Sequence, residues 1–179
     1  QTGQQLATSG AQNGVTACAG CHGAQGEGHA AGGFPRIAGP SAAYLGKQLG
    51  AYANGARVNP IMQPIAKAMN AEQIRDVSAY YASLGDASAG AAAAGAKPSA
   101  AGTDRGATLS AIGDDARGVQ ACANCHGPGG VGNQPVYPYL AGQHANYLTA
   151  AMAAWKNGAR KTDSSGQMTH VAQSLPDAD

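Results

Sequence analysis

Large side chains and charged side chains are both scarce in this chain of 179 residues. It contains one Phe and one Trp, aromatic residues make up 5%, and charged residues make up 12%. Chains of this length need a sizeable buried apolar surface to fold, and small side chains supply little of it. We therefore expect a large apolar cofactor to complete the core.

Net charge and long apolar runs are also lacking. The formal net charge is +1, with a balance of +2 over residues 1–85 and of zero over residues 105–179. This pattern excludes a strong field for nucleic acid or for an anionic membrane surface. No run of eighteen apolar residues occurs, so we expect no transmembrane segment. The chain opens at Gln1 without a signal segment, which we interpret as the numbering of a processed, secreted protein.

The sequence does contain an internal repeat. Its four cysteines form two identical clusters, Cys18-Ala-Gly-Cys21-His22 and Cys122-Ala-Asn-Cys125-His126, which are 104 positions apart. Further matches follow each cluster at nearly the same offset, pairing Phe34–Gly39 with Tyr137–Gly142, Tyr44 with Tyr147, Tyr52 with Trp155, Asn54–Arg57 with Asn157–Arg160, and Met62 with Met168. A single shared spacing over so many positions indicates a duplicated domain.

The predicted fold is all-α, with two tandem domains. We place the first domain at residues 1–85 and the second at residues 105–179, joined by an Ala- and Gly-rich linker over residues 86–104. Apolar residues at helical spacing predict helices over residues 3–17, 41–54, 71–84, 106–121 and 144–157. Asn70 is the expected N-cap of the helix over 71–84, and Gly85 is its expected stop.

The second copy ends before a counterpart of the helix over 71–84. Its last residues, Leu175 to Asp179, resemble the first turn of such a helix, with Pro176 followed by acidic side chains. We therefore expect the natural chain to continue beyond Asp179 with another amphipathic segment.

The Cys-x-x-Cys-His clusters permit several chemistries. A zinc ribbon needs its two cysteine pairs about 15–20 residues apart, and a thioredoxin-like pair follows a strand, so neither pattern matches. A structural disulfide across so short a loop constrains the unfolded chain little and gives no role to the histidine. Thioether attachment of haem uses all three residues, with His22 and His126 as proximal iron ligands. The sequence therefore predicts two covalently bound haem c groups.

The repeat also selects the remaining iron ligands. Of the four methionines, Met62 and Met168 alone occupy equivalent positions, so we predict that they are the distal ligands, while Met69 is a core residue. His170 is a competing ligand for the second haem. The carbonyls of Pro35 and Pro138 are the expected acceptors for the imidazole N–H groups.

These features resemble class I cytochromes c. The tandem arrangement, with Pro-Arg-Ile-Ala-Gly and Tyr-Leu-x-x-Gln-Leu in the first copy, is similar to cytochrome c4 and its di-haem relatives. The resemblance implies two helical domains facing each other, with haem propionates near their interface. It also implies a set of pocket or propionate-binding residues, namely Arg36, Tyr44, Tyr52, Arg57, Trp155 and Arg160.

We predict from this a bacterial periplasmic carrier of single electrons rather than an enzyme. Filled axial positions leave no open iron site for oxygen or peroxide. The expected partners are a redox donor and a terminal oxidase or reductase. Two alternatives stay open. One is a cytochrome subunit of a larger dehydrogenase or oxidase complex, including a complex associated with a membrane. The other is a redox enzyme such as a peroxidase or a thiosulfate dehydrogenase.

Overall fold

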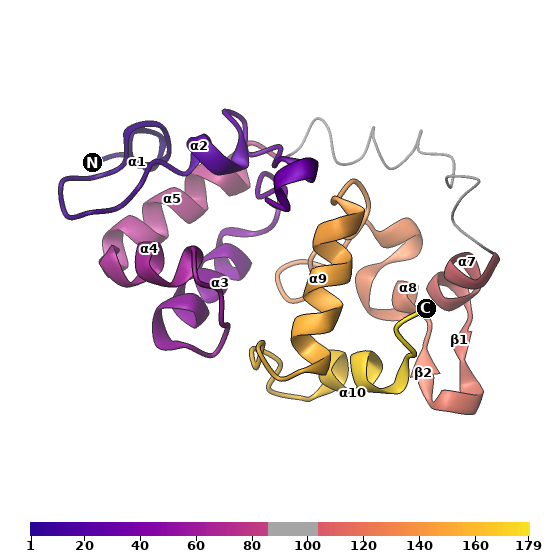
Figure 1. The fold of residues 1–179 in the computed structure, drawn as a ribbon. Coiled ribbons are helices and arrows are strands. Elements are labelled where there is room, and N and C mark those ends of the chain that lie inside the picture. The colour runs from indigo at the N-terminus through magenta and orange to yellow at the C-terminus, as the bar shows by residue number, and fades with distance from the viewer. Residues whose placement is uncertain (86–103) are drawn as a thin grey trace.

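The computed structural model describes residues 1–85 and 104–179, which form two helical lobes side by side (Figure 1). Each lobe corresponds to one copy of the sequence repeat. Most of the linker expected over residues 86–104 lies outside the described residues; Asp104 already begins a helix. No described helix is long and apolar enough to cross a bilayer.

The described residues are mostly helical, with one short antiparallel pair of strands. The elements of the first lobe are α1 (Gly3–Ser9), α2 (Ala19–His22), α3 (Ala42–Asn54), α4 (Met62–Ala68) and α5 (Ala71–Ser83). Those of the second lobe are α7 (Asp104–Ala111), β1 (Gly113–Asp114), β2 (Val119–Gln120), α8 (Cys122–His126), α9 (Ala145–Lys156) and α10 (Gln167–Ser174).

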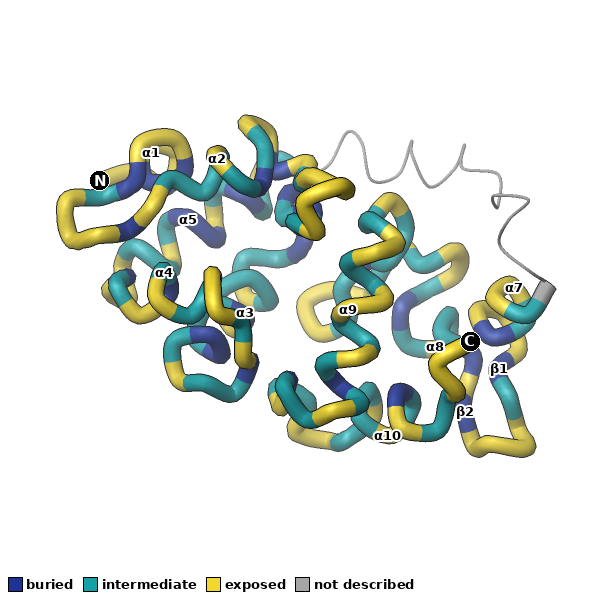
Figure 2. The backbone as a smooth tube through the Cα atoms, in the orientation of Figure 1, coloured by how far each residue is buried: buried dark blue, intermediate teal, exposed yellow. Residues whose placement is uncertain are grey.

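Helix α5 is the centre of the first lobe and packs against both α1 and α3. It begins with a capping box in which Asn70 and Gln73 satisfy each other's backbone N–H groups, and Gly85 follows its end, as predicted. Helix α1 can approach α5 closely because Gly3 has no side chain. A Cβ at this position would lie 2.0 Å from the Asp76 carbonyl oxygen, which is too close. Val77 and Tyr81 of α5 belong to the buried core of this lobe, and Figure 2 shows buried stretches along this helix.

The predicted helices over residues 3–17 and 106–121 are too long, and both predictions were wrong in the same way. Gly10 and Gly113 adopt φ values of 70° and 91°, and a Cβ at either would lie 2.3 Å from a carbonyl oxygen across the turn. The chain reverses at each glycine instead of continuing as helix. In the second lobe the reversal forms the hairpin β1–β2, which the sequence pattern did not predict.

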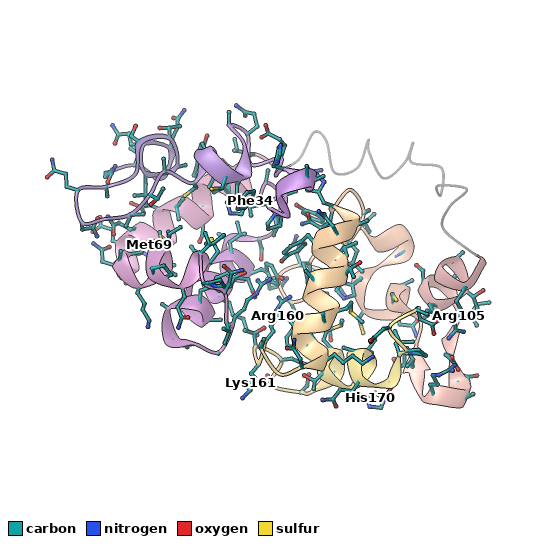
Figure 3. The ribbon with its side chains drawn as sticks, in the orientation of Figure 1. Phe34, Met69, Arg105, Arg160, Lys161 and His170 are labelled. Atoms are coloured by element: carbon teal, nitrogen blue, oxygen red, sulfur yellow. The ribbon has the colours of Figure 1, made fainter. Side chains whose placement is uncertain are left out.

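The second lobe is built from α7 to α10, and α10 is the counterpart of α4. Within residues 104–179 no helix follows α10, so the described part of this lobe shows no counterpart of α5. Its first and last segments are joined by Arg105, which contacts Asp114 at 2.6 Å and Asp179 at 2.7 Å (Figure 3).

Candidate haem sites

Helix α2 carries the first candidate iron ligand. Cys18 is its N-cap and His22 is its last residue, so both thiols and the imidazole lie within about one helical turn. Nδ1 of His22 lies 2.9 Å from the Pro35 carbonyl oxygen. His22 is only 7% exposed, and its ring meets Phe34 edge-on. Because Nδ1 is held by the carbonyl, Nε2 is the nitrogen left to bind iron.

The second lobe repeats this arrangement on α8. Nδ1 of His126 lies 2.7 Å from the Pro138 carbonyl oxygen, and His126 is also 7% exposed. Tyr137 takes the place of Phe34 beside the ring. The structure therefore makes in both copies the contact that the sequence analysis assigned to the two prolines.

A glycine-rich loop holds each proline carbonyl against its histidine. In the first lobe Gly28 N–H donates to the His22 carbonyl at 2.7 Å, and Ile37 N–H donates to Gly26 at 2.8 Å. In the second lobe the corresponding donors are Gly132, at 2.6 Å from the His126 carbonyl, and Leu140, at 2.8 Å from the Gly130 carbonyl. The loops are therefore built alike, and each positions an acceptor for one imidazole.

Burial shapes the protonation of these groups. It lowers the pKa of His22, although the Pro35 carbonyl opposes this, so the ring is neutral near pH 7, which is the form that binds a metal. Burial also raises the pKa of the Cys18 and Cys122 thiols. These raised pKa values are opposite to the activated thiolate of a redox Cys-x-x-Cys pair.

The repeat-matched methionines both lie in the first turn of a helix. Met62 begins α4, where the Asn59 side chain accepts hydrogen bonds from the backbone N–H groups of Ile61 and Met62 at 2.9 Å. Met168 is the second residue of α10, where Asp163 accepts from the Thr169 N–H at 3.0 Å. Both side chains are half-buried. In each lobe a polar side chain of the preceding loop thus accepts from the backbone of the helical turn that carries the methionine.

The competing candidates lie elsewhere. His170 is exposed on the outer side of α10, where its Nε2 lies 3.2 Å from the Gly118 carbonyl oxygen (Figure 3). Met69 is 9% exposed and belongs to the apolar core of the first lobe, as predicted. The position of His170 favours Met168 as the ligand of the second site.

The two lobes meet through a crossed pair of arginines. Arg57 Nη2 donates to the Tyr147 hydroxyl at 2.8 Å, and Arg160 Nη2 donates to the Tyr44 hydroxyl at 3.1 Å, so each arginine contacts the tyrosine of the other lobe. Each guanidinium also stacks on an aromatic ring of its own lobe, Arg57 on Tyr52 at 4.7 Å. Arg160 lies in the same way over Trp155, at 4.5 Å. The interface is thus nearly twofold symmetric.

Gln48 on α3 breaks this symmetry. Its Oε1 accepts one hydrogen bond from Arg57 Nη1 and one from Arg160 Nη2, both at 3.0 Å. The second copy has Ala151 at the matching position, so no second amide is present. The two guanidiniums therefore share one neutral acceptor.

Neither arginine has an acidic partner within the described residues. Both are 7% exposed, and the salt bridges of residues 1–85 and 104–179 all involve other cations. Burial alone would raise the pKa of Tyr147, but the charges of Arg57 and Arg160 hold it below its ordinary value. Burial raises the pKa of Tyr52 to about 12. A buried cation without a counter-charge is costly, so this cluster is arranged to receive an anion.

A second group of contacts joins the lobes near Arg36. Its guanidinium lies 5.4 Å from the centre of the Tyr139 ring, and the Tyr139 hydroxyl donates to the Ala38 carbonyl at 2.7 Å. The Gln143 side chain accepts from the Arg36 N–H at 2.9 Å and donates to its carbonyl at 3.0 Å. Arg36 therefore lies in the interface but outside the cluster of Arg57 and Arg160.

The sequence analysis gave no role to three of these interface residues, although Gln48 is the Gln of its Tyr-Leu-x-x-Gln-Leu motif. Gln48 and Gln143 lie at positions where the other copy has Ala151 and Pro40, so the repeat comparison gave them no weight. Tyr147 appeared there only as the match of Tyr44. The two glutamines could have been found by asking which polar residues occur in one copy only.

These residues fit a haem group in each lobe. In each lobe the thiols and an imidazole share one helical turn, and in the first lobe the half-buried side chains of Cys18, Ile37, Leu45 and Ile65 pack around the apolar core. The buried guanidiniums between the lobes match the carboxylates that a haem carries on one edge. Residues 1–85 and 104–179 contain no group of three His, Cys, Asp or Glu side chains that could hold a bare metal ion.

Comparisons with known proteins agree with this chemistry. The cytochrome c family model matches residues 1–85. The thiosulfate dehydrogenase electron acceptor of Stutzerimonas stutzeri (strain A1501) is 44% identical over 98% of this chain and 80% of its own length.

Two solved structures share the fold of both lobes. Reduced recombinant cytochrome c4 from Pseudomonas stutzeri superposes with a TM-score of 0.80 at 30% identity, covering 99% of this chain and 90% of that one. The thiosulfate dehydrogenase TsdBA from Marichromatium purpuratum gives a TM-score of 0.86 at 39% identity over 98% of this chain. This chain spans only 37% of the length of that protein. The chain belongs to the family of di-haem class I cytochromes c that includes cytochrome c4, whose members transfer electrons through covalently bound haem c.

Proposed function

We propose that each iron is held by one histidine and one methionine, His22 with Met62 and His126 with Met168. The observation that supports this most directly is the duplicated contact between an imidazole Nδ1 and a proline carbonyl. That contact fixes the ring orientation and directs Nε2 toward the iron. A methionine thioether as the second ligand would favour the reduced iron relative to a second imidazole, which suits an electron acceptor.

The buried arginines supply the second part of the proposal. Arg57 and Arg160 bind haem propionates at the interface, with Tyr44, Tyr52 and Trp155 shaping their surroundings. Two buried cations without acidic partners in the described residues support this assignment. Arg36 contributes positive charge at the same interface.

The donor that we propose is a thiosulfate-oxidising dehydrogenase. A relative that is 44% identical over nearly the whole chain is named as an electron acceptor of such an enzyme. This chain would accept single electrons in the bacterial periplasm and pass them to a terminal oxidase or reductase. The bound haems supply the one-electron chemistry, while the protein holds them and presents their edges to partners.

Rapid mixing under anaerobic conditions tests the donor. The oxidised cytochrome is mixed with a purified thiosulfate dehydrogenase and thiosulfate, and haem reduction is followed by absorption. We expect the dehydrogenase to reduce both haems, with an uptake of two electrons per chain. No reduction in the presence of an active dehydrogenase would contradict the proposal.

The same experiment without the dehydrogenase separates a carrier from an enzyme. If the chain only carries electrons, thiosulfate alone leaves it oxidised on the time scale of the catalysed reaction. Rapid reduction by thiosulfate alone would show that the chain itself oxidises the substrate. The variant Gln4→Ala, which changes an exposed residue of α1, is the control and should react like the natural chain.

A further inference from the structure

The Gln48 side chain lies where a cation from each lobe contacts the same atom. Its Oε1 is 3.0 Å from Arg57 Nη1 and 3.0 Å from Arg160 Nη2. A guanidinium can only donate hydrogen bonds, so the atom between the two cations must be an acceptor, and the carbonyl oxygen of an amide fulfils this role without charge. Gln48 is 7% exposed, so water competes little for either bond.

The position of Gln48 brings two like charges close together. Both guanidinium nitrogens contact one oxygen, so they are at most twice 3.0 Å apart, and they repel each other in a buried setting. The amide dipole offsets part of this repulsion and determines where each guanidinium lies. The backbones give a second constraint, because Val58 N–H donates to the Ala159 carbonyl and Lys161 N–H donates to the Ala56 carbonyl.

The asymmetry of the interface makes this role specific. The Tyr44–Tyr147, Tyr52–Trp155 and Arg57–Arg160 pairs are matched between the copies, whereas Gln48 faces Ala151 in the alignment. One side chain from the first lobe therefore positions a cation of each lobe. A substitution of Gln48 therefore changes the surroundings of both guanidiniums. A substitution of a residue that is matched in the other copy first affects the contacts of one lobe.

We propose that Gln48 is a positioning residue that adjusts the reduction potentials of both haems through Arg57 and Arg160. The inference rests on the proposed function, in which these arginines are the partners of the haem propionates. Cations near a haem favour its reduced form, because reduction removes one positive charge from the iron. Any change in the charge or place of the shared acceptor then alters both potentials.

The test is a spectroelectrochemical titration of the complete, haem-loaded protein. Gln48→Glu places a negative charge between the two guanidiniums, so we expect both midpoint potentials to shift downward by similar amounts. Gln48→Met keeps the side-chain length and removes the acceptor, so we expect it to move both potentials as well. Gln4→Glu adds the same charge on the exposed face of α1 and should leave both potentials close to those of the natural chain.

A shift of one potential only, or of neither, in Gln48→Glu would overturn the inference. If that variant fails to bind its haems, Gln48→Met decides by the same criterion. Arg57→Gln separates this inference from the proposed function. If Arg57→Gln shifts a potential but the Gln48 variants do not, only the role of Gln48 fails. If Arg57→Gln leaves both potentials unchanged, the assignment of the propionates fails as well.

Discussion

Arg57 and Arg160 pair with each other as an antiparallel β-bridge, although they lie in different copies of the repeat. Each follows the same Asn-Gly-Ala turn, and each N–H donates to a carbonyl six residues earlier, Arg57 to Ala51 at 3.0 Å and Arg160 to Ala154 at 2.9 Å. The local structure that ends α3 and α9 therefore also creates the contact between the lobes (Figure 1). An element of the single domain becomes, after duplication, the centre of the interface.

The first prediction concerns haem attachment. The denatured chain should keep both haems, because thioether bonds at Cys18, Cys21, Cys122 and Cys125 survive unfolding. Intact mass spectrometry measures this directly. Replacing both Cys122 and Cys125 by Ser should remove the mass of one haem and leave the other in place. A natural chain with one haem or none would contradict the assignment.

The second prediction concerns the distal ligands. Met62→Ala and Met168→Ala should each remove about half of the Met-to-iron charge-transfer absorption and lower the potential of one haem, because a thioether favours the reduced iron. Met69→Ala is the matched control. It should destabilise the first lobe by about 2–5 kcal/mol through the cavity that it leaves, with the absorption intact. If Met69→Ala loses the charge-transfer absorption and Met62→Ala keeps it, Met69 is the ligand and the assignment of Met62 is wrong.

The third prediction concerns the crossed arginines. Tyr147→Phe removes the acceptor of a buried guanidinium and should lower the free energy of unfolding by about 1.5–3 kcal/mol, measured by guanidinium titration. Tyr137→Phe is the control, because its hydroxyl donates to the Gln167 side chain in an exposed contact and the first copy has Phe34 at this position. That variant should stay within about 0.5 kcal/mol of the natural chain. If both variants lower the free energy of unfolding equally, the hydrogen bond from Arg57 to Tyr147 does not stabilise the interface as predicted.

The fourth prediction concerns acid stability. Hydrogen bonds from Arg105 and then Arg117 lower the pKa of Asp114 to about 2. Because the carboxylate is favoured in the folded state, its contribution is complete above the ordinary pKa and is lost as the pH falls from about 4 through 2. The melting temperature of the second lobe should fall over that range. In Asp114→Asn the melting temperature at pH 7 should be lower, and its fall between about pH 4 and pH 2 should be smaller than in the natural chain. An equal fall in the variant and in the natural chain would contradict the prediction.

The fifth prediction concerns encounter with redox partners. The net charge is +1 and charged residues are few, so docking should depend mainly on apolar surface around the haem edges. The second-order rate constant for electron transfer should therefore change little between low and physiological ionic strength. Stopped-flow kinetics over a salt series gives this rate. A steep fall with salt would show that local charges guide the encounter.

The sequence by itself determined the chemistry of this protein, because haem attachment is encoded by residues that are adjacent in the chain. Cys18, Cys21 and His22 lie within five consecutive positions, so their spacing can be recognised without knowledge of the fold. The repeat then indicated which methionines and prolines are equivalent. The family resemblance pointed to Arg57, Arg160 and Tyr44, which the structure places in one cluster between the lobes. The all-α fold followed from apolar residues at helical spacing.

The tertiary structure decided where helices stop and how the lobes meet. Gly10 and Gly113 reverse the chain because carbonyls from across the turn leave no room for a Cβ, a contact that no local pattern contains. Gln48 acquires its role because Arg57 and Arg160 arrive from opposite lobes at one oxygen. Periodicity describes how a residue relates to its own helix, whereas the sharing of a buried acceptor depends on two surfaces that meet only after both lobes have folded.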